Sequence, residues 1–449
     1  MGRLFGTDGV RGIANKDLTC ELAMNIGRAA AHVLAKEKVK RPKILIGKDT
    51  RSSSTMLESA LSAGICSTGA DVVLVGNVPT PAVAFLVSDC GADAGFMISA
   101  SHNPCEYNGI KIFDSNGYKL PDEMEEEIES LVLDDSSPIS APIGGEVGSI
   151  FKREDYLEDY IKYLLSTVNV SFNGLKIAID CANGSAFYTA EKIFNALGAE
   201  CYMLHAKPNG TNINSECGST DMRDLIRFVN ANGMDLGLAF DGDADRCLAV
   251  DEKGQIIDGD KLIAVFAKEL KSKNKLVNNT AVVTVMTNIG FSKFAEENDI
   301  FVDVTAVGDR YVLESMVKNC YKIGGEQSGH IIFKDFASTG DGQLTGIQFA
   351  AAMVRNNKTA SELASVMQSY PQTMINVKVS NEVKKILNTD SDIQNIIKEK
   401  SNILGTNGRV LVRASGTEPL IRVMIEGPNI KEINNMAKEI AAVIESKEK

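Results

Sequence analysis

Aspartate occupies every second position in the segment AFDGDADR, residues 239–246. Because alternate side chains of an extended segment share one face, we expect the carboxylates of Asp241, Asp243 and Asp245 to lie together. Such a group of oxygens suits Mg²⁺ and leaves a coordination position for a phosphate oxygen. The guanidinium of Arg246, the next residue, can bind the same phosphate. An acidic hairpin turn is the alternative, but repulsion among three close carboxylates favours a bound cation.

The stretch GFMISASHNP, residues 95–104, is an apolar run that ends in a polar turn. A strand of this kind delivers Ser101 beyond its carboxyl end, where α/β sheets bind ligands. A hydrolase nucleophile is disfavoured, because there is no G-x-S-x-G elbow and because neighbouring side chains, here Ser101 and His102, usually diverge. A serine that caps a turn is the structural alternative. A serine that carries a phosphoryl group needs a metal and basic side chains nearby, and the chain offers both.

Two further loops contain groups that bind phosphate and sugar. The segment LVRASGTEPLIRVMIEG, residues 411–427, places two hydroxyls, a glycine and two arginines around one turn, which indicates a phosphate-binding nest. Its candidates are Arg413, Ser415, Gly416, Thr417 and Arg422. In GGEQSGH, residues 324–330, alternation lets Glu326, Ser328 and His330 project together, and these groups suit sugar hydroxyls.

Three cations near the N-terminus could join the serine. Arg11 lies in FGTDGVRG, and Arg51 lies in the loop GKDTRSSS after a strand. Lys111, in EYNGIKIF, could come back to Ser101 on a return strand. Beside a metal and arginines its pKa could be lowered, so that it acts as a base. Surface ion pairs and a solvated lysine are the structural alternatives.

The elements that position these loops follow one pattern. A short apolar strand, a polar loop, an amphipathic helix and a second strand occur over residues 43–76, 175–204 and 280–310. Strands that alternate with helices in this way indicate βαβ units. A Ser/Pro/Gly-rich connector (134–149), a turn between domains (251–261) and a new strand (370–379) separate the segments.

We therefore predict an α/β fold of three related α/β domains with mixed sheets, plus a smaller C-terminal α+β domain. The predicted ranges are 1–150 for the phosphoserine domain, 151–253 for the metal-binding domain, 254–369 for the sugar-binding domain and 370–449 for the phosphate-binding domain. The last domain ends in a helix with one apolar face, made of Ile433, Met436, Ala437, Ile440, Ala441 and Ile444.

Composition limits the partners. The 449 residues carry a formal net charge of −12, which argues against a nucleic-acid partner. We find no apolar run long enough to span a membrane and no signal-peptide core. The nine cysteines show neither a CxxC motif nor a His/Cys ligand spacing, which favours reduced core thiols and a cytoplasmic protein.

In this order, the loops resemble those of the α-D-phosphohexomutase superfamily. ASHNP matches its phosphoserine loop, DGDADR its metal loop, GEQSGH its sugar loop and RASGTEP its phosphate loop, and the likeness covers nearly the whole chain. The resemblance implies domains around a central cleft, a phosphoryl group on Ser101, and one Mg²⁺ per chain bound by Ser101, Asp241, Asp243 and Asp245. It implies that the catalytic residues are Ser101, His102, Lys111, Arg11, Arg51 and Arg246. It implies that the substrate-binding residues are Gly308, Glu326, Ser328, His330, Arg413, Ser415, Gly416, Thr417 and Arg422.

Within the superfamily the sequence is similar to the glucosamine-type mutases. Gln327 replaces the Met of the GEMSGH motif that phosphomannomutase/phosphoglucomutase enzymes typically carry, and Asp309 and Arg310 follow Gly308. This implies an isomerase that interconverts glucosamine 6-phosphate and glucosamine 1-phosphate through glucosamine 1,6-bisphosphate, for UDP-N-acetylglucosamine and cell-wall synthesis. It also implies a phosphosugar partner and a homodimer. The alternatives are a phosphomannomutase/phosphoglucomutase, a metal-dependent phosphohydrolase and a non-catalytic sugar-phosphate sensor.

Overall fold

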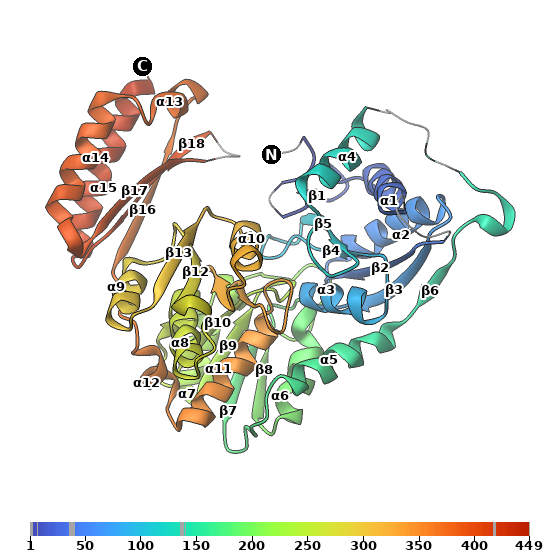
Figure 1. The fold of residues 1–449 in the computed structure, drawn as a ribbon, viewed down its shortest axis with the longest axis horizontal. Coiled ribbons are helices and arrows are strands. Elements are labelled where there is room, and N and C mark those ends of the chain that lie inside the picture. Colours follow the sequence, from blue (N-terminus) through green and yellow to red (C-terminus); the bar gives the residue numbers. More distant parts are fainter. Residues whose placement is uncertain are drawn as a thin grey trace. The chain divides into compact units, whose positions relative to one another are not determined.

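The computed structural model of the chain (Figure 1) describes residues 3–6, 8–35, 41–134, 139, 141–415 and 419–448. These residues form two compact units. The large unit comprises Met1–Met286 and Ile300–Val366, and the small unit comprises Thr287–Asp299 and Met367–Lys449.

The first sheet of the large unit has six strands in the order β1-β5-β4-β2-β3-β6. Its strands are β1 (Val10–Ile13), β2 (Lys43–Lys48), β3 (Asp71–Asn77), β4 (Ala94–Ile98), β5 (Tyr107–Asp114) and β6 (Ile150–Lys152), and its helices are α1 (Cys20–Ala35), α2 (Ser52–Cys66), α3 (Thr80–Asp89) and α4 (Asp122–Leu133). The parallel pair β2 and β3, joined through α2, confirms the βαβ unit predicted over 43–76. Every residue of β4 (AGFMI) is buried, as expected of a central strand in an α/β sheet. β5 runs antiparallel to β4, which confirms the predicted return strand.

The second sheet has five strands in the order β11-β10-β9-β7-β8. They are β7 (Lys176–Asp180), β8 (Glu200–Leu204), β9 (Leu236–Phe240), β10 (Cys247–Asp251) and β11 (Ile256–Ile257), with helices α5 (Leu157–Ser166), α6 (Thr189–Ala196) and α7 (Arg223–Asn232). The unit β7-α6-β8 is parallel, as predicted over 175–204. Part of the segment 251–261, predicted as a turn between domains, forms a hairpin of this sheet, because β11 pairs antiparallel with β10.

The third sheet has four strands in the order β13-β12-β14-β15. They are β12 (Thr280–Thr284), β13 (Phe301–Thr305), β14 (Ile323–Gly325) and β15 (Ile331–Phe333), with helices α8 (Gly259–Ser272), α10 (Asp309–Asn319), α11 (Gly342–Asn356) and α12 (Ala360–Ala364). β12 and β13 are parallel, as predicted over 280–310. The helix that joins them, α9 (Ile289–Glu297), belongs to the small unit.

The small unit contains the fourth sheet, three antiparallel strands in the order β16-β18-β17. They are β16 (Gln372–Lys378), β17 (Arg409–Ala414) and β18 (Leu420–Glu426), with helices α13 (Asn381–Ile386), α14 (Ser391–Leu404) and α15 (Ile430–Glu445). Glu426 at the end of β18 accepts hydrogen bonds from Asn288 Nδ2 at 3.2 Å and from the Ile289 N–H at 3.1 Å, which ties α9 to this sheet. The predicted apolar face of α15 is confirmed, since it is buried at Ile433, Ala437, Ile440, Ala441 and Ile444.

Two expectations from composition can be compared with these elements. Within the described residues, no helix is both long and apolar enough to cross a bilayer. All nine cysteines are free thiols, and Cys66, Cys181, Cys217 and Cys247 are buried, as predicted for core thiols. Cys320 is exposed.

Candidate active site

The three aspartates lie in the tight connection between the antiparallel strands β9 and β10. Each offers one carboxylate oxygen, and these atoms lie within 4.8 Å of one another. The sequence prediction that Asp241, Asp243 and Asp245 share one face is therefore confirmed. Between the first two stands Gly242, where a Cβ would come 2.6 Å from the carbonyl oxygen of Ser101. Only glycine allows the hairpin to approach the serine loop so closely.

Ser101 follows β4 and lies against this hairpin. Its φ of 51° is in the left-handed region, which costs a residue with a Cβ about 1–2 kcal/mol. Its Oγ donates a hydrogen bond to Asp241 Oδ2 at 2.7 Å, and its N–H donates to Ser99 Oγ at 2.9 Å. The side chain is 0% exposed. The two loops that the sequence predicted to cooperate are thus in direct contact.

Two carboxylate oxygens of the hairpin lack a hydrogen-bond partner among the described residues. They are Asp243 Oδ1 and Asp245 Oδ1, and both are buried. Burial, followed by repulsion from Asp245 and Asp243, raises the pKa of Asp241 well above its usual value. A hard cation would supply the charge and the ligation that these buried oxygens need. The residues present therefore fit Mg²⁺.

Lys111 lies on β5, where that strand passes back along β4. Its Nζ is 2.8 Å from Asp243 Oδ2, 3.2 Å from Asp245 Oδ2 and 3.1 Å from Asp8 Oδ2. Burial favours the neutral amine, but the three carboxylates outweigh burial and hold the pKa of Lys111 well above its usual value. The lowered pKa that we predicted for Lys111, beside a bound metal and arginines, stays a prediction. Carboxylates, rather than arginines, are its nearest charges.

The guanidinium of Arg51 is fully used in holding the serine loop. Its Nε donates to Asp49 Oδ2 at 2.9 Å. Its Nη1 donates to the carbonyl oxygens of Asn103 at 3.1 Å and Pro104 at 2.8 Å. Its Nη2 donates to the carbonyl oxygens of Ser101 at 2.9 Å and Asn103 at 3.0 Å. All five N–H groups thus have acceptors, which leaves none for a phosphate. Arg51 does belong to the predicted environment of Ser101, but it acts on the backbone of the loop.

Arg246 lies over the hairpin and over His102. Its Nε is 4.0 Å from Asp241 Oδ2 and 3.8 Å from Asp245 Oδ1, and its Nη1 is 3.1 Å from His102 Nδ1. A guanidinium can only donate, so His102 Nδ1 accepts. Burial, followed by the charges of Arg246 and Arg11, lowers the pKa of His102 to about 4. The imidazole is therefore neutral near pH 7.

His102 Nδ1 also lies 3.3 Å from Ser101 Oγ. We predicted that these neighbouring side chains would diverge, and that prediction is wrong. The rule holds for extended strands, in which successive side chains point to opposite faces. Here the left-handed backbone of Ser101 breaks the alternation and lets the two side chains meet.

Arg11 reaches the site through a residue that the sequence analysis did not select. On β1, its guanidinium pairs with Asp8, and Asp8 also pairs with Lys111 and Lys119. Burial alone would raise the pKa of Asp8, but its cationic partners lower it below its usual range. The signal for Asp8 was its place beside Arg11 in FGTDGVRG.

Two other residues of the site carry no sequence signal that we can identify. Thr80, at the start of α3, donates from Oγ1 to Asp243 Oδ2 at 2.7 Å. Asn214 Nδ2 donates to the carbonyl oxygens of Ser101 at 2.9 Å and Asn103 at 3.0 Å. Both residues come from segments without a catalytic motif. Only the fold brings them to the site.

The GEQSGH segment forms the turn between β14 and β15. Glu326 accepts a hydrogen bond from the Gly308 N–H at 3.0 Å and one from Ser328 Oγ at 3.5 Å. These bonds bring together the two segments that the resemblance assigned to the sugar. Gln327, which replaces the Met of GEMSGH, donates instead to Asp258 Oδ2 at 3.4 Å.

His330 makes contacts of its own. It is buried, with Nδ1 at 3.6 Å from Asp245 Oδ2, and its Nε2 accepts the Gly340 N–H at 3.1 Å. The segment is a turn and not an extended strand, so alternation does not support the predicted common face of Glu326, Ser328 and His330, which stays a prediction. His330 connects the sugar loop to the metal loop.

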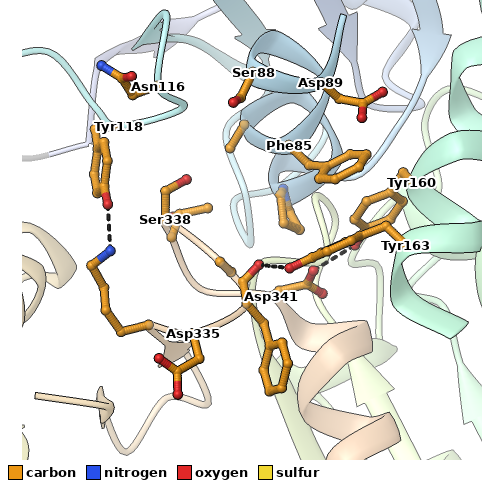
Figure 2. A pocket seen from close by; sticks show the side chains of 16 residues that line it. Phe85, Ser88, Asp89, Asn116, Tyr118, Tyr160, Tyr163, Asp335, Ser338 and Asp341 are labelled. Carbon is orange, nitrogen blue, oxygen red and sulfur yellow. Dashed lines mark hydrogen bonds between the residues drawn. The ribbon is translucent and has the colours of Figure 1, made fainter. Parts of the chain in front are cut away.

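A pocket of about 340 Å³ lies in the large unit (Figure 2). Segments 81–89, 116–118, 160–163 and 334–341 contribute its walls. Within it, Tyr160 donates to Asp341 Oδ2 at 2.8 Å, and burial raises the pKa of Asp341 to about 6. None of the lining residues belongs to the serine loop or the metal loop. We therefore do not assign the predicted chemistry to this pocket.

The phosphate loop lies in the small unit, where β17 and β18 pair. Arg413 and Arg422 are register partners, and burial together with the charge of Arg422 lowers the pKa of Arg413. The Ser415 N–H closes the turn onto the first residue of β18 at 2.9 Å. Two adjacent guanidiniums repel, so an anion bound between them is favoured. Gly416 and Thr417 lie outside the described residues.

Comparisons with known proteins decide among the families. Models of the four domains of phosphoglucomutase/phosphomannomutase match residues 2–138 (domain I), 155–254 (domain II), 258–370 (domain III) and 374–443 (C-terminal domain). The phosphoglucosamine mutase of Clostridium novyi (strain NT) is 53% identical over 447 residues, which cover 100% of this chain and 99% of that protein. The chain belongs to the phosphoglucosamine mutase family.

Solved structures share the fold of this phosphoglucosamine mutase family member. A phosphoglucomutase/phosphomannomutase family protein from Burkholderia thailandensis matches with a TM-score of 0.81 and 24% identity over 97% of each chain. The N-acetylphosphoglucosamine mutase of Aspergillus fumigatus, in complex with GlcNAc-6P and magnesium, matches with a TM-score of 0.71 and 17% identity over 99% of this chain and 96% of that one. The predicted α/β fold with mixed sheets is therefore confirmed.

Proposed function

We propose that the protein interconverts glucosamine 6-phosphate and glucosamine 1-phosphate, with Ser101 as the carrier of the phosphoryl group. The contact between Ser101 Oγ and Asp241, inside a cluster of three buried aspartates, carries this proposal. A phosphoryl group on this oxygen would stand where a cation can bind, which is what phosphoryl transfer requires. The full-length identity to a phosphoglucosamine mutase supports glucosamine as the sugar.

We infer that Asp241, Asp243 and Asp245 hold one Mg²⁺ together with the phosphoryl group on Ser101. When bound, Mg²⁺ neutralises the charge that develops on the transferred group. The protein keeps these ligands in place by short contacts. Thr80 Oγ1 orients Asp243 at 2.7 Å, and the Arg246 N–H donates to Asp241 Oδ1 at 3.3 Å.

Lys111 is our proposed acceptor for the proton of the attacking sugar hydroxyl. Its three carboxylate partners raise its pKa, which by itself disfavours this task. A cation that draws the charge of Asp243 and Asp245 toward itself would lower the pKa of Lys111. Cation binding and the basicity of Lys111 are therefore linked in this proposal.

His102 and Arg246 control access to Ser101. Ser101 is fully buried, His102 Nδ1 lies 3.3 Å from its Oγ, and the same nitrogen accepts from Arg246 Nη1. We propose that they turn aside when the sugar binds, and that Arg246 then donates to the phosphoryl oxygens. The neutral imidazole of His102 can accept a hydrogen bond in either position.

The remaining predicted residues bind the sugar and its second phosphate in our proposal. Glu326 and Ser328 face ring hydroxyls. The phosphate that does not react binds to Arg413, Ser415, Gly416, Thr417 and Arg422. Guanidiniums and backbone N–H groups suit both halves of the reaction, because they recognise a phosphate whichever sugar carbon carries it. A homodimer and a cytoplasmic location stay predictions from the sequence.

The substrate assignment can be tested by comparing kcat/KM on glucosamine 6-phosphate, glucose 6-phosphate and mannose 6-phosphate. We expect glucosamine 6-phosphate to be preferred by at least about 100-fold, since a site that hydrogen-bonds an amino group rejects analogues that pair with it poorly. A preference for glucose or mannose would favour the phosphomannomutase/phosphoglucomutase alternative. Release of one free phosphate per turnover would instead indicate a phosphohydrolase.

Arg51→Lys should lower kcat about 100-fold and leave KM nearly unchanged. Lysine offers one point of donation in place of a five-donor fork, so the serine loop would shift, and a shift of about 1 Å costs roughly that factor. Steady-state kinetics on glucosamine 6-phosphate measure both constants. Arg41→Lys is the matched control, because Arg41 is a surface residue that pairs with Asp71. Equal kcat in the two variants would remove Arg51 from the site.

A further inference from the structure

A second cluster of metal-ligating side chains lies in the large unit. Asp180, His205 and Cys217 each offer one ligand atom, and these atoms lie within 4.8 Å of one another. Asp180 and Cys217 are fully buried, while the side chain of His205 is 26% exposed. The sequence shows no ligand spacing because the three residues come from separate segments. The cluster shares no residue with the three-aspartate site.

The second sheet brings these segments together. Asp180 ends β7, in parallel register with the last residue of β8, and His205 follows that residue. Both side chains therefore leave the same edge of the sheet. Cys217 arrives on the loop before the short 3₁₀ helix η4 (Gly218–Thr220). At Gly218, which has a φ of 69°, a Cβ would come 2.5 Å from the backbone at the end of β9, so glycine allows the cysteine segment to approach.

Hydrogen bonds orient these side chains as they do in metal sites. His205 Nδ1 lies 2.9 Å from Asp180 Oδ2, and on the other side of the ring Nε2 lies 3.5 Å from Asp224 Oδ2. A carboxylate behind the imidazole fixes the tautomer of a metal-binding histidine. The other oxygen of Asp180, Oδ1, accepts the Ala182 N–H at 2.9 Å. Oδ2 is thereby directed toward the cluster.

A plain ion pair accounts for only part of this arrangement. It explains why an imidazole lies between Asp180 and Asp224. It gives no reason for a buried thiol, that of Cys217, to lie within reach of both the carboxylate and the imidazole. Oxygen, nitrogen and sulfur ligands together are the set expected for a borderline transition metal, and unlike the all-oxygen set that selects Mg²⁺.

We propose that Asp180, His205 and Cys217 bind one transition-metal cation, and that Zn²⁺ fits the ligand set best. On binding, an imidazolium His205 loses its Nδ1 proton and keeps the Nε2 proton that faces Asp224, and Cys217 Sγ loses its proton; both protons go to solvent. The dication, the carboxylate and the thiolate then sum to zero charge, and no electron is transferred. Three protein ligands leave the fourth position of the tetrahedron to water. Metal binding of this kind stabilises the fold around it.

The site would stabilise a loop that supports the catalytic serine. The loop 205–217 begins at one ligand and ends at another, and between them it carries Asn214. Asn214 Nδ2 donates to the carbonyl oxygens of Ser101 and Asn103. A metal that joins His205 to Cys217 therefore holds Asn214 against the serine loop. In this proposal the metal supports the loop, and the phosphoryl transfer takes place at the three aspartates.

The test uses Co²⁺ as a spectroscopic probe for Zn²⁺ in the full chain, with Mg²⁺ in excess. We expect one equivalent of Co²⁺ to bind with a thiolate charge-transfer band in the near ultraviolet, and Zn²⁺ to displace it. Cys217→Ser and His205→Gln should each abolish the band and weaken Zn²⁺ binding more than about 100-fold. Asp224→Asn, which changes only the group behind the imidazole, should weaken binding by about 10-fold.

Two matched controls should keep the band. Cys201→Ser removes a thiol of the same sheet that lies outside the cluster, and Asp243→Asn removes a ligand of the proposed Mg²⁺ site. The proposal is overturned if the wild-type chain shows no thiolate–cobalt band, or if the band survives in His205→Gln. Loss of the band in Cys201→Ser would assign it to another thiol and would also overturn the proposal. If Cys217→Ser does not fold, the cobalt band of His205→Gln still tests the proposal.

Discussion

Ser101→Ala should lower the rate of glucosamine 1-phosphate formation by at least about 10⁴-fold, a loss typical of removing the group that forms the covalent intermediate. In the wild type, Oγ lies 2.7 Å from Asp241, beside the oxygens that fit a cation. Alanine leaves no atom there to carry the phosphoryl group. The methyl group fills the buried position of the hydroxymethyl group, so the fold should be kept. A coupled assay with glucosamine 6-phosphate, Mg²⁺ and a trace of sugar 1,6-bisphosphate measures the rate.

Ser99→Ala is the matched control for this prediction. Ser99 is also buried, donates to Asp49 Oδ2 at 2.7 Å and accepts the Ser101 N–H, so its loss disturbs the position of the loop but not its chemistry. We expect a drop of about 10-fold, in line with the loss of one positioning hydrogen bond. Mass spectrometry of wild-type peptides should find phosphate on Ser101. Full activity of Ser101→Ala would place the phosphoryl carrier elsewhere.

The elements that deliver the catalytic loops could be predicted from local sequence. The buried run of β4 has strand length and ends in polar residues, so the position of Ser101 at a carboxyl end follows from the α/β pattern. The strands on both sides of the three aspartates follow from the apolar runs LGLAF and CLAV. Even the return of Lys111 on β5 followed from the chain order. Each of these predictions depends on neighbours in sequence.

The parts that could not be predicted depend on contacts between distant segments. The sequence shows that Arg51 is present but not that it donates five hydrogen bonds, two of them to the Asn103 carbonyl oxygen. The same holds for the pKa of Lys111, which is set by Asp243, Asp8 and Asp245. The left-handed conformation of Ser101 is likewise required by its surroundings rather than by its residue type.

Asp241→Asn should abolish the response of the protein to Mg²⁺ without destabilising the cation-free form. Burial and repulsion from the other two aspartates raise the pKa of Asp241, so its carboxyl group holds a proton to higher pH than an ordinary aspartate does. A neutral amide resembles that protonated state. Melting temperatures in EDTA should therefore be equal or slightly higher in the variant. In saturating Mg²⁺ we expect the wild type alone to gain roughly 5 °C or more, as binding at 100 times Kd stabilises by about 2.7 kcal/mol.

The same pKa predicts how Mg²⁺ affinity depends on pH. An unfolded aspartate titrates near 4, and the folded cation-free protein keeps the proton of Asp241 to higher pH. The folded state therefore binds more protons than the unfolded chain, and the cation-free stability falls as pH rises across this interval. Because Mg²⁺ must displace that proton, its affinity should rise about tenfold per pH unit over the same interval. Calorimetric titrations with Mg²⁺ at several pH values measure this slope.

Asp341→Asn is the control for Asp241→Asn. It removes a buried carboxylate that is not a proposed Mg²⁺ ligand. Asp341 is buried and has a raised pKa, yet it binds Tyr160 and the first turn of α11 rather than the metal loop. This variant should keep the Mg²⁺-dependent gain in melting temperature and a slope of affinity with pH close to that of the wild type. In Asp241→Asn, activity should fall at least about 10³-fold, because preorganised charge stabilisation is lost at the reacting phosphoryl group. A pH-independent affinity in the wild type would show that Asp241 is ionised before the cation arrives, and a preserved Mg²⁺ response in Asp241→Asn would remove it from the ligand set.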